Sequence, residues 1–102
     1  MQLALIHTLC QDEEEAKKIS KALLTKRLVA CTNYFSAQSN YFWKGALQED
    51  QEMTLLLKTT PVLAQQAKQE ILRIHSYETA YVAILSADVN KEYYAWVLEQ
   101  TS

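Results

Sequence analysis

The stretch of sequence that decides the fold is residues 29–59, which reads VACTNYF (29–35), SAQSN (36–40), YFWKG (41–45), ALQEDQE (46–52) and MTLLLKT (53–59). β-Branched and aromatic residues crowd both sides of Gly45, the only glycine of the chain, and this composition is typical of strands. The stretch predicts two long antiparallel strands, at residues 29–43 and 53–59, joined by a connection near residues 45–51.

The length of this hairpin indicates that it bends or projects from the body of the protein. A strand over residues 29–43 would run roughly 50 Å, whereas a compact domain of this size has a radius of gyration near ~13 Å. We expect a bend or bulge at the polar patch 36–40. A projecting arm that carries Tyr41, Phe42 and Trp43 exposes apolar surface and strand edges, which a second copy of the chain would cover.

The segment before the hairpin predicts a strand followed by a helix. Residues 2–9 are short and apolar, as in a buried strand, and residues 12–28 carry apolar side chains at helical spacing. Asp12 is placed as the N-cap, with Glu15 three residues on in a capping-box arrangement.

The segment after the hairpin predicts a helix, a strand and a last helix. Thr60 and Pro61 begin a helix that ends near His75, residues 80–85 form a strand, and Asn90 begins a short C-terminal helix. The order β-α-β-β-α-β with one added helix predicts a single α+β domain of the ferredoxin-like type over residues 1–102.

Composition narrows the classes of function. The formal net charge is −2 and no basic cluster exists, which argues against nucleic acid as a partner. No segment approaches the ~18 apolar residues of a membrane helix, and the N-terminus lacks the basic region of a signal peptide. The two cysteines lack CxxC spacing and are interpreted as free thiols, so we expect a cytoplasmic protein.

Few residues have the character of a chemical site. His7 and Cys10 form an H-x-x-C pair of metal-ligand types, although a structural role is favoured because free cysteine is among the most buried residues. Cys31 lies in an apolar run and is interpreted as core. His75 is either a binding residue, in a loop with Tyr77 and Glu78, or a plain helix C-cap.

An acidic run and a set of aromatic residues are two further candidates for a functional site. Glu49, Asp50 and Glu52 are interpreted as a solvated turn rather than a paired-carboxylate site, and no P-loop, GxGxxG or Ser-His-Asp order supports an enzyme. The aromatic residues exceed what this core needs, which favours an interface or an aromatic-lined cleft; they are Tyr41, Trp43, Tyr77, Tyr81 and Trp96.

Six pieces of the chain, in order and spacing, resemble the CutA-type divalent-cation tolerance proteins from about residue 3 to residue 96. They are TLCQDEEEA (8–16), RLVACTN (27–33), YFWKG (41–45), LKT (57–59), HSYE (75–78) and NKEYYAW (90–96). The resemblance implies a ferredoxin-like subunit in a tight homotrimer similar to the PII signalling proteins. It further implies a non-enzymatic, cytoplasmic protein linked to tolerance of copper and other divalent metals.

The resemblance also implies a metal site and an interface between subunits. It places candidate metal ligands, for copper above all, at Cys10, His75 and Glu78, and trimer-interface residues at Tyr41, Phe42, Trp43 and Trp96. The sequence departs from the family where Gln11 replaces a proline and where the loop after His75 lacks two prolines and a carboxylate. We expect that loop to be less rigid and metal binding to be weakened.

Two rival functions remain open at this stage. One is a PII-like signalling module that binds a small ligand in clefts between subunits. Its candidate ligand residues are Tyr41, Trp43, Lys44, Lys58 and Tyr77, with Arg73 as a further anion contact. The other is a structural trimer that anchors partner proteins.

Overall fold

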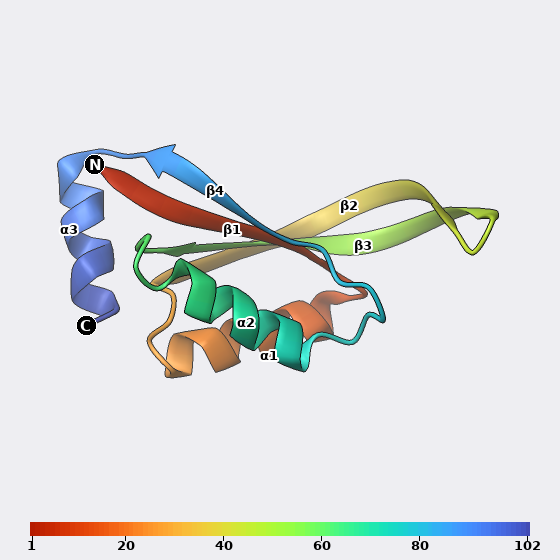
Figure 1. Cartoon of the computed structure of the whole chain (residues 1–102), viewed down its shortest axis with the longest axis horizontal. Helices are drawn as coiled ribbons and strands as arrows, with labels where there is room; N and C mark the ends of the chain where they lie inside the picture. Colours follow the sequence, from red (N-terminus) through yellow and green to blue (C-terminus); the bar gives the residue numbers. More distant parts are fainter.

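The computed structural model describes residues 1–102 and confirms the predicted order of elements (Figure 1). The elements are β1 (Gln2–Cys10), α1 (Glu13–Thr25), β2 (Cys31–Trp43), β3 (Ala46–Thr59), α2 (Ala64–Ile74), β4 (Val82–Asp88) and α3 (Lys91–Gln100). The strands form one antiparallel sheet in the order β2-β3-β1-β4. This is the ferredoxin-like arrangement, with the added helix α3 at the end of the sheet.

The core lies between the sheet and the pair α1 and α2, which cover one face (Figure 1). Alternate residues of β1 point into it, because successive side chains of a strand face opposite sides. Ile6 and Cys10 are fully buried there, together with Ile19 of α1, Leu57 of β3 and Ile71 of α2. No helix is long and apolar enough to cross a membrane.

The hairpin β2–β3 projects from the body, as its length predicts (Figure 1). The molecule measures 45 × 24 × 20 Å, with a radius of gyration of 14.2 Å. The predicted bulge at residues 36–40 is wrong, because the β2–β3 pairing runs without a break from Cys31 opposite Lys58 to Trp43 opposite Ala46. The hairpin reaches outward by extending in one register rather than by bending at a defect in the ladder.

The connection between the two hairpin strands is also shorter than predicted. It consists of Lys44 and Gly45 alone, both with positive φ (50° and 82°), as in a type I′ turn. The acidic residues 49–52 therefore lie in β3 and do not form a solvated turn. Glu52 is only 6% exposed.

Other predicted boundaries shift as well, including the start of β2, which is Cys31 and not residue 29. Helix α1 ends at Thr25, not at residue 28, because Arg27 adopts φ 59° and the Leu28 N–H donates to the Leu23 carbonyl, as in a Schellman cap. Helix α2 begins at Ala64 after a turn over residues 61–63. Strand β1 continues one residue further, to Cys10. Strand β4 starts and ends later than predicted, since it pairs along β1 down to Gln2.

Candidate metal centre and adjoining cleft

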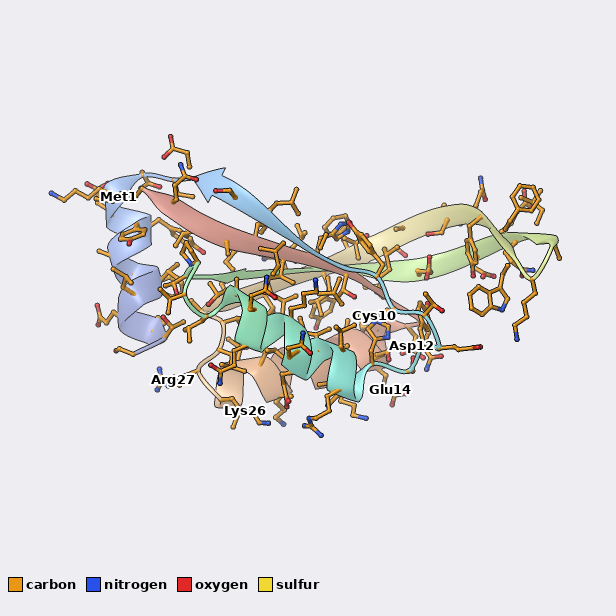
Figure 2. The ribbon with its side chains drawn as sticks, viewed as in Figure 1. Met1, Cys10, Asp12, Glu14, Lys26 and Arg27 are labelled. Atoms are coloured by element: carbon orange, nitrogen blue, oxygen red, sulfur yellow. The ribbon has the colours of Figure 1, made fainter.

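Three segments bring a thiol, a carboxylate and an imidazole together beneath one end of the sheet. Cys10 ends β1, Glu15 lies in the first turn of α1, and His75 caps the C-terminus of α2. One donor atom from each lies within 4.8 Å of the others. In Figure 2, Cys10 and Asp12 are labelled where β1 leads into α1, while Lys26 and Arg27 mark the opposite end of that helix.

Glu15 is held by hydrogen bonds from two separate segments. The Gln11 N–H donates to Oε1 (2.9 Å) and the Ser76 N–H donates to Oε2 (2.8 Å). Burial works against the ionised form, but these bonds and the nearby His75 outweigh it and lower the pKa of the carboxyl. The start of the helix fixes this placement, because the Asp12 side chain accepts from the Glu15 N–H (2.9 Å).

The contacts of His75 define its tautomer. Its Nε2 lies 2.9 Å from the Leu9 carbonyl, which only accepts, so Nε2 carries the proton. Its Nδ1 accepts from the Tyr77 N–H (3.2 Å) and lies 3.8 Å from Oε2 of Glu15. The side chain is 1% exposed, so an ion that binds Nδ1 would have to replace its contact with the Tyr77 N–H.

Cys10 is fully buried and is a protonated thiol at neutral pH. Burial, and then the negative charges of Glu15, Asp12 and Glu52, raise its pKa to about 12. The three side chains and the short distances between their donor atoms fit a soft metal ion, because such ions prefer thiolate and imidazole as ligands. An ion bound here would have to displace the thiol proton.

The structure does not bring Glu78 into this group. Its exposed carboxylate lies 3.8 Å from Lys44 Nζ at the hairpin turn. Glu15 is the third donor instead. In the sequence, Glu15 is predicted only as part of the helix cap. The available signal in the sequence is a carboxylate at the third position of a helix that begins three residues after a cysteine.

The other candidate residues lie outside the cluster. His7 faces the opposite side of the sheet from Cys10, and its Nδ1 lies 3.0 Å from the Tyr81 hydroxyl. Cys31 is half-buried rather than a core residue. Lys58 is remote from the hairpin turn, beside Asn33 (3.1 Å) and the Tyr93 ring, and Arg73 pairs with Glu70 on α2.

A cleft of about 760 Å³ adjoins the cluster where the hairpin leaves the body. It contains the predicted cleft residues Tyr41, Trp43 and Tyr77, together with Tyr81. The Tyr77 hydroxyl donates to Oε1 of Glu52 (2.7 Å), and both residues belong to the lining of the cleft. The four predicted interface residues are all exposed; they are Tyr41 (38%), Phe42 (75%), Trp43 (39%) and Trp96 (41%).

The sheet order, the projecting hairpin and the two-helix layer define an α+β protein of the ferredoxin-like class with a buried thiol–carboxylate–imidazole group. The family model of the CutA1 divalent ion tolerance protein matches residues 4–100. The chain belongs to this family.

Two relatives and one solved structure of the family match this chain over most of their length. The divalent-cation tolerance protein CutA of Pyrococcus horikoshii is 36% identical over 100 residues, which are 97% of this chain and 98% of that protein. The Thermus thermophilus protein is 40% identical over 91 residues, 87% of this chain and 88% of that protein. The crystal structure of CutA1 from Ehrlichia chaffeensis superposes with a TM-score of 0.95 at 33% identity, covering 98% of this chain and 95% of that chain.

Proposed function

We propose that this protein acts in the response to divalent metal ions as a non-enzymatic, cytoplasmic homotrimer that binds copper at Cys10, Glu15 and His75. The observation that carries the proposal is the convergence of their three donor atoms within 4.8 Å from three different segments. Membership of a divalent ion tolerance family supports the same class of function.

The donor set favours Cu(I) over magnesium or calcium. Thiolate and imidazole are soft or intermediate ligands, whereas magnesium and calcium require several oxygen ligands. Cys10 supplies the thiolate after losing its proton, and His75 supplies Nδ1 in exchange for its 3.2 Å contact with the Tyr77 N–H. Glu15 keeps free lone pairs on both oxygens, since each oxygen accepts one backbone N–H.

The test is a Cu(I) competition titration against a colorimetric chelator, with wild type and single variants. Cys10→Ser and His75→Ala should each weaken binding by about tenfold or more, because each removes one ligand. Cys31→Ser is the matched control and should bind as wild type does. Glu15→Gln and Glu78→Gln decide which carboxylate takes part.

The proton displaced from Cys10 gives a second readout. Its pKa is about 12, so binding should release a proton at neutral pH and strengthen by about tenfold for each unit of pH. Thermal unfolding without metal verifies that each variant is folded. Equal copper affinity of wild type and folded Cys10→Ser would remove this cluster from the function.

The cytoplasmic location belongs to the same proposal and rests on the two free thiols, Cys10 and Cys31. A related structure, at 29% identity, is described as the periplasmic divalent cation tolerance protein CutA of Archaeoglobus fulgidus. Fractionation of cells that express the full chain tests the location directly, and recovery in the periplasmic fraction would contradict it.

A further inference from the structure

The cleft beside the metal cluster has a lining that the metal-binding proposal does not use. It lies between the distal part of the hairpin and the loop over residues 76–81, and its volume of about 760 Å³ is within the range of small-molecule sites. Four aromatic side chains line it, from Tyr41 and Trp43 on β2 and from Tyr77 and Tyr81 around the loop.

The charge of the lining is negative. Glu52 and Glu78 are both among the twelve lining residues, and none of the twelve is lysine, arginine or histidine. Glu52 is only 6% exposed and pairs with no cation. Its Oε1 accepts from the Tyr77 hydroxyl (2.7 Å), which leaves Oε2 without a protein partner in the cleft wall. A buried carboxylate is costly unless a cation or hydrogen-bond donor compensates it.

The protein already places one ammonium group against this wall. Lys44 Nζ lies 5.7 Å from the centroid of the Trp43 ring and 3.8 Å from Oε2 of Glu78. The side chains of Lys44 and Glu78 are each 72% exposed, so this contact is open to exchange. An ammonium over an aromatic face with a carboxylate nearby is the arrangement by which proteins recognise organic cations.

We propose that the cleft binds a small organic cation, an alkylammonium or quaternary ammonium compound, with its charge facing Glu52 and its alkyl groups against Trp43, Tyr41 and Tyr77. This reverses the charge expected for a ligand held by Lys44 and Lys58, because Lys58 lies elsewhere and Lys44 competes for the same groups. A metal ion fits less well, since Glu52 and Glu78 do not join any cluster of three ligand side chains.

The experiment compares choline with 3,3-dimethylbutan-1-ol, its uncharged isostere, by calorimetry and by quenching of Trp43 fluorescence in a Trp96→Phe background. Choline should bind at least about tenfold more tightly than the isostere, because only the cation gains from the aromatic faces and the carboxylate. Equal binding of the two compounds, or no binding of choline at millimolar concentration, would overturn the proposal.

Substitutions in the cleft lining test whether choline binds there. Glu52→Gln should weaken choline binding by about tenfold while its amide oxygen still accepts from Tyr77. Glu49→Gln, on the same strand but outside the cleft, is the matched control and should change nothing. Trp43→Leu gives a second loss variant, and because Trp43 is also a predicted interface residue, thermal unfolding and light scattering verify that this variant keeps the fold and the assembly of wild type. Unchanged choline affinity in folded Glu52→Gln and Trp43→Leu would place the binding elsewhere.

Lys44→Met separates a cation site from an anion site by the sign of its effect. Removal of a competing ammonium should strengthen choline binding or leave it unchanged, whereas an anion site would lose affinity. A choline affinity that falls in Lys44→Met contradicts the proposal. Cys10→Ser should bind choline as wild type does, so failure of the metal proposal and failure of this one are distinguishable.

Discussion

At the residue scale, Glu15 is the group on which the candidate metal centre depends. Its two oxygens join the end of β1, the start of α1 and the loop after α2 through the N–H groups of Gln11 and Ser76. Because the carboxylate is 7% exposed, water cannot replace either bond without opening the structure. The residue therefore ties the segment that follows Cys10 to the loop that follows His75.

We expect Glu15→Gln to lower the free energy of unfolding by about 1–3 kcal/mol, because an amide nitrogen would face one of the two N–H donors and leave it unsatisfied. Denaturant unfolding at pH 7 measures the loss. Lys17, exposed on the next turn, gives the control Lys17→Gln, which should remain within about 0.5 kcal/mol of wild type.

The same carboxyl predicts a pH dependence. Its folded-state pKa lies below the ordinary value of 4.5, so its stabilising contribution is complete above that pH and is lost as the pH falls through the folded-state pKa. Wild type should lose stability over that acid range, and Glu15→Gln should show a smaller decline. Parallel curves for the two proteins would contradict the assigned bonds.

The structure brings together two residues that the sequence offers as candidate metal ligands, Cys10 and His75, and a third, Glu15, that it does not. Cys10 and His75 are rare residue types at the ends of elements, where side chains from different segments converge. In the sequence, Glu15 is fully explained as a capping-box residue, whose side chain would accept from the N–H of the N-cap residue Asp12. In the structure it accepts instead from the N–H of Gln11, one position before the N-cap. The bond to Ser76 spans 61 residues, and no local pattern can reveal it.

At the scale of elements, the hairpin explains why some boundaries could not be predicted. Residues 40–47 are all exposed, so neither face of the distal hairpin packs against the core of its own chain. Alternation between apolar and polar residues, the usual signal of a strand, is then missing. The polar run 36–40 and the acidic run 49–52 flank this part of the hairpin and carry residue types that are common in turns, so they predict a bulge and a turn although both lie in strands.

Gly45 is the residue that allows the two-residue turn. It adopts φ 82°, and no atom lies within 4 Å of the position of an added Cβ, so only backbone strain opposes a side chain there. Gly45→Ala should destabilise the protein by about 1–2 kcal/mol, measured by thermal or denaturant unfolding. Lys44→Asn is the control at φ 50°, since asparagine tolerates this conformation, and it should be neutral or stabilising. An equal loss in both variants would argue against the type I′ turn.

At the scale of the whole molecule, the exposed arm is difficult to reconcile with a monomer. Phe35, Phe42 and Leu47 are 53%, 75% and 61% exposed along the hairpin, and β2 and β4 are unpaired edges of the sheet. Apolar patches and free edges of this kind are usually covered by another chain. Strand pairing between copies would satisfy both needs at once, so we expect an oligomer, and the resemblance to the CutA family implies that it is a trimer.

Light scattering coupled to size-exclusion chromatography should give three times the chain mass of 11.7 kDa, with and without copper.

Phe42→Lys should raise the concentration at which the trimer dissociates, because it removes about 1.5–3 kcal/mol of apolar burial per copy. Val62→Lys is the matched control. Val62 is 90% exposed in the turn before α2, away from the arm, so this variant should remain a trimer. Dissociation by Val62→Lys but not by Phe42→Lys would move the interface to the helical face, and a monomeric wild type would leave the arm solvated on both faces.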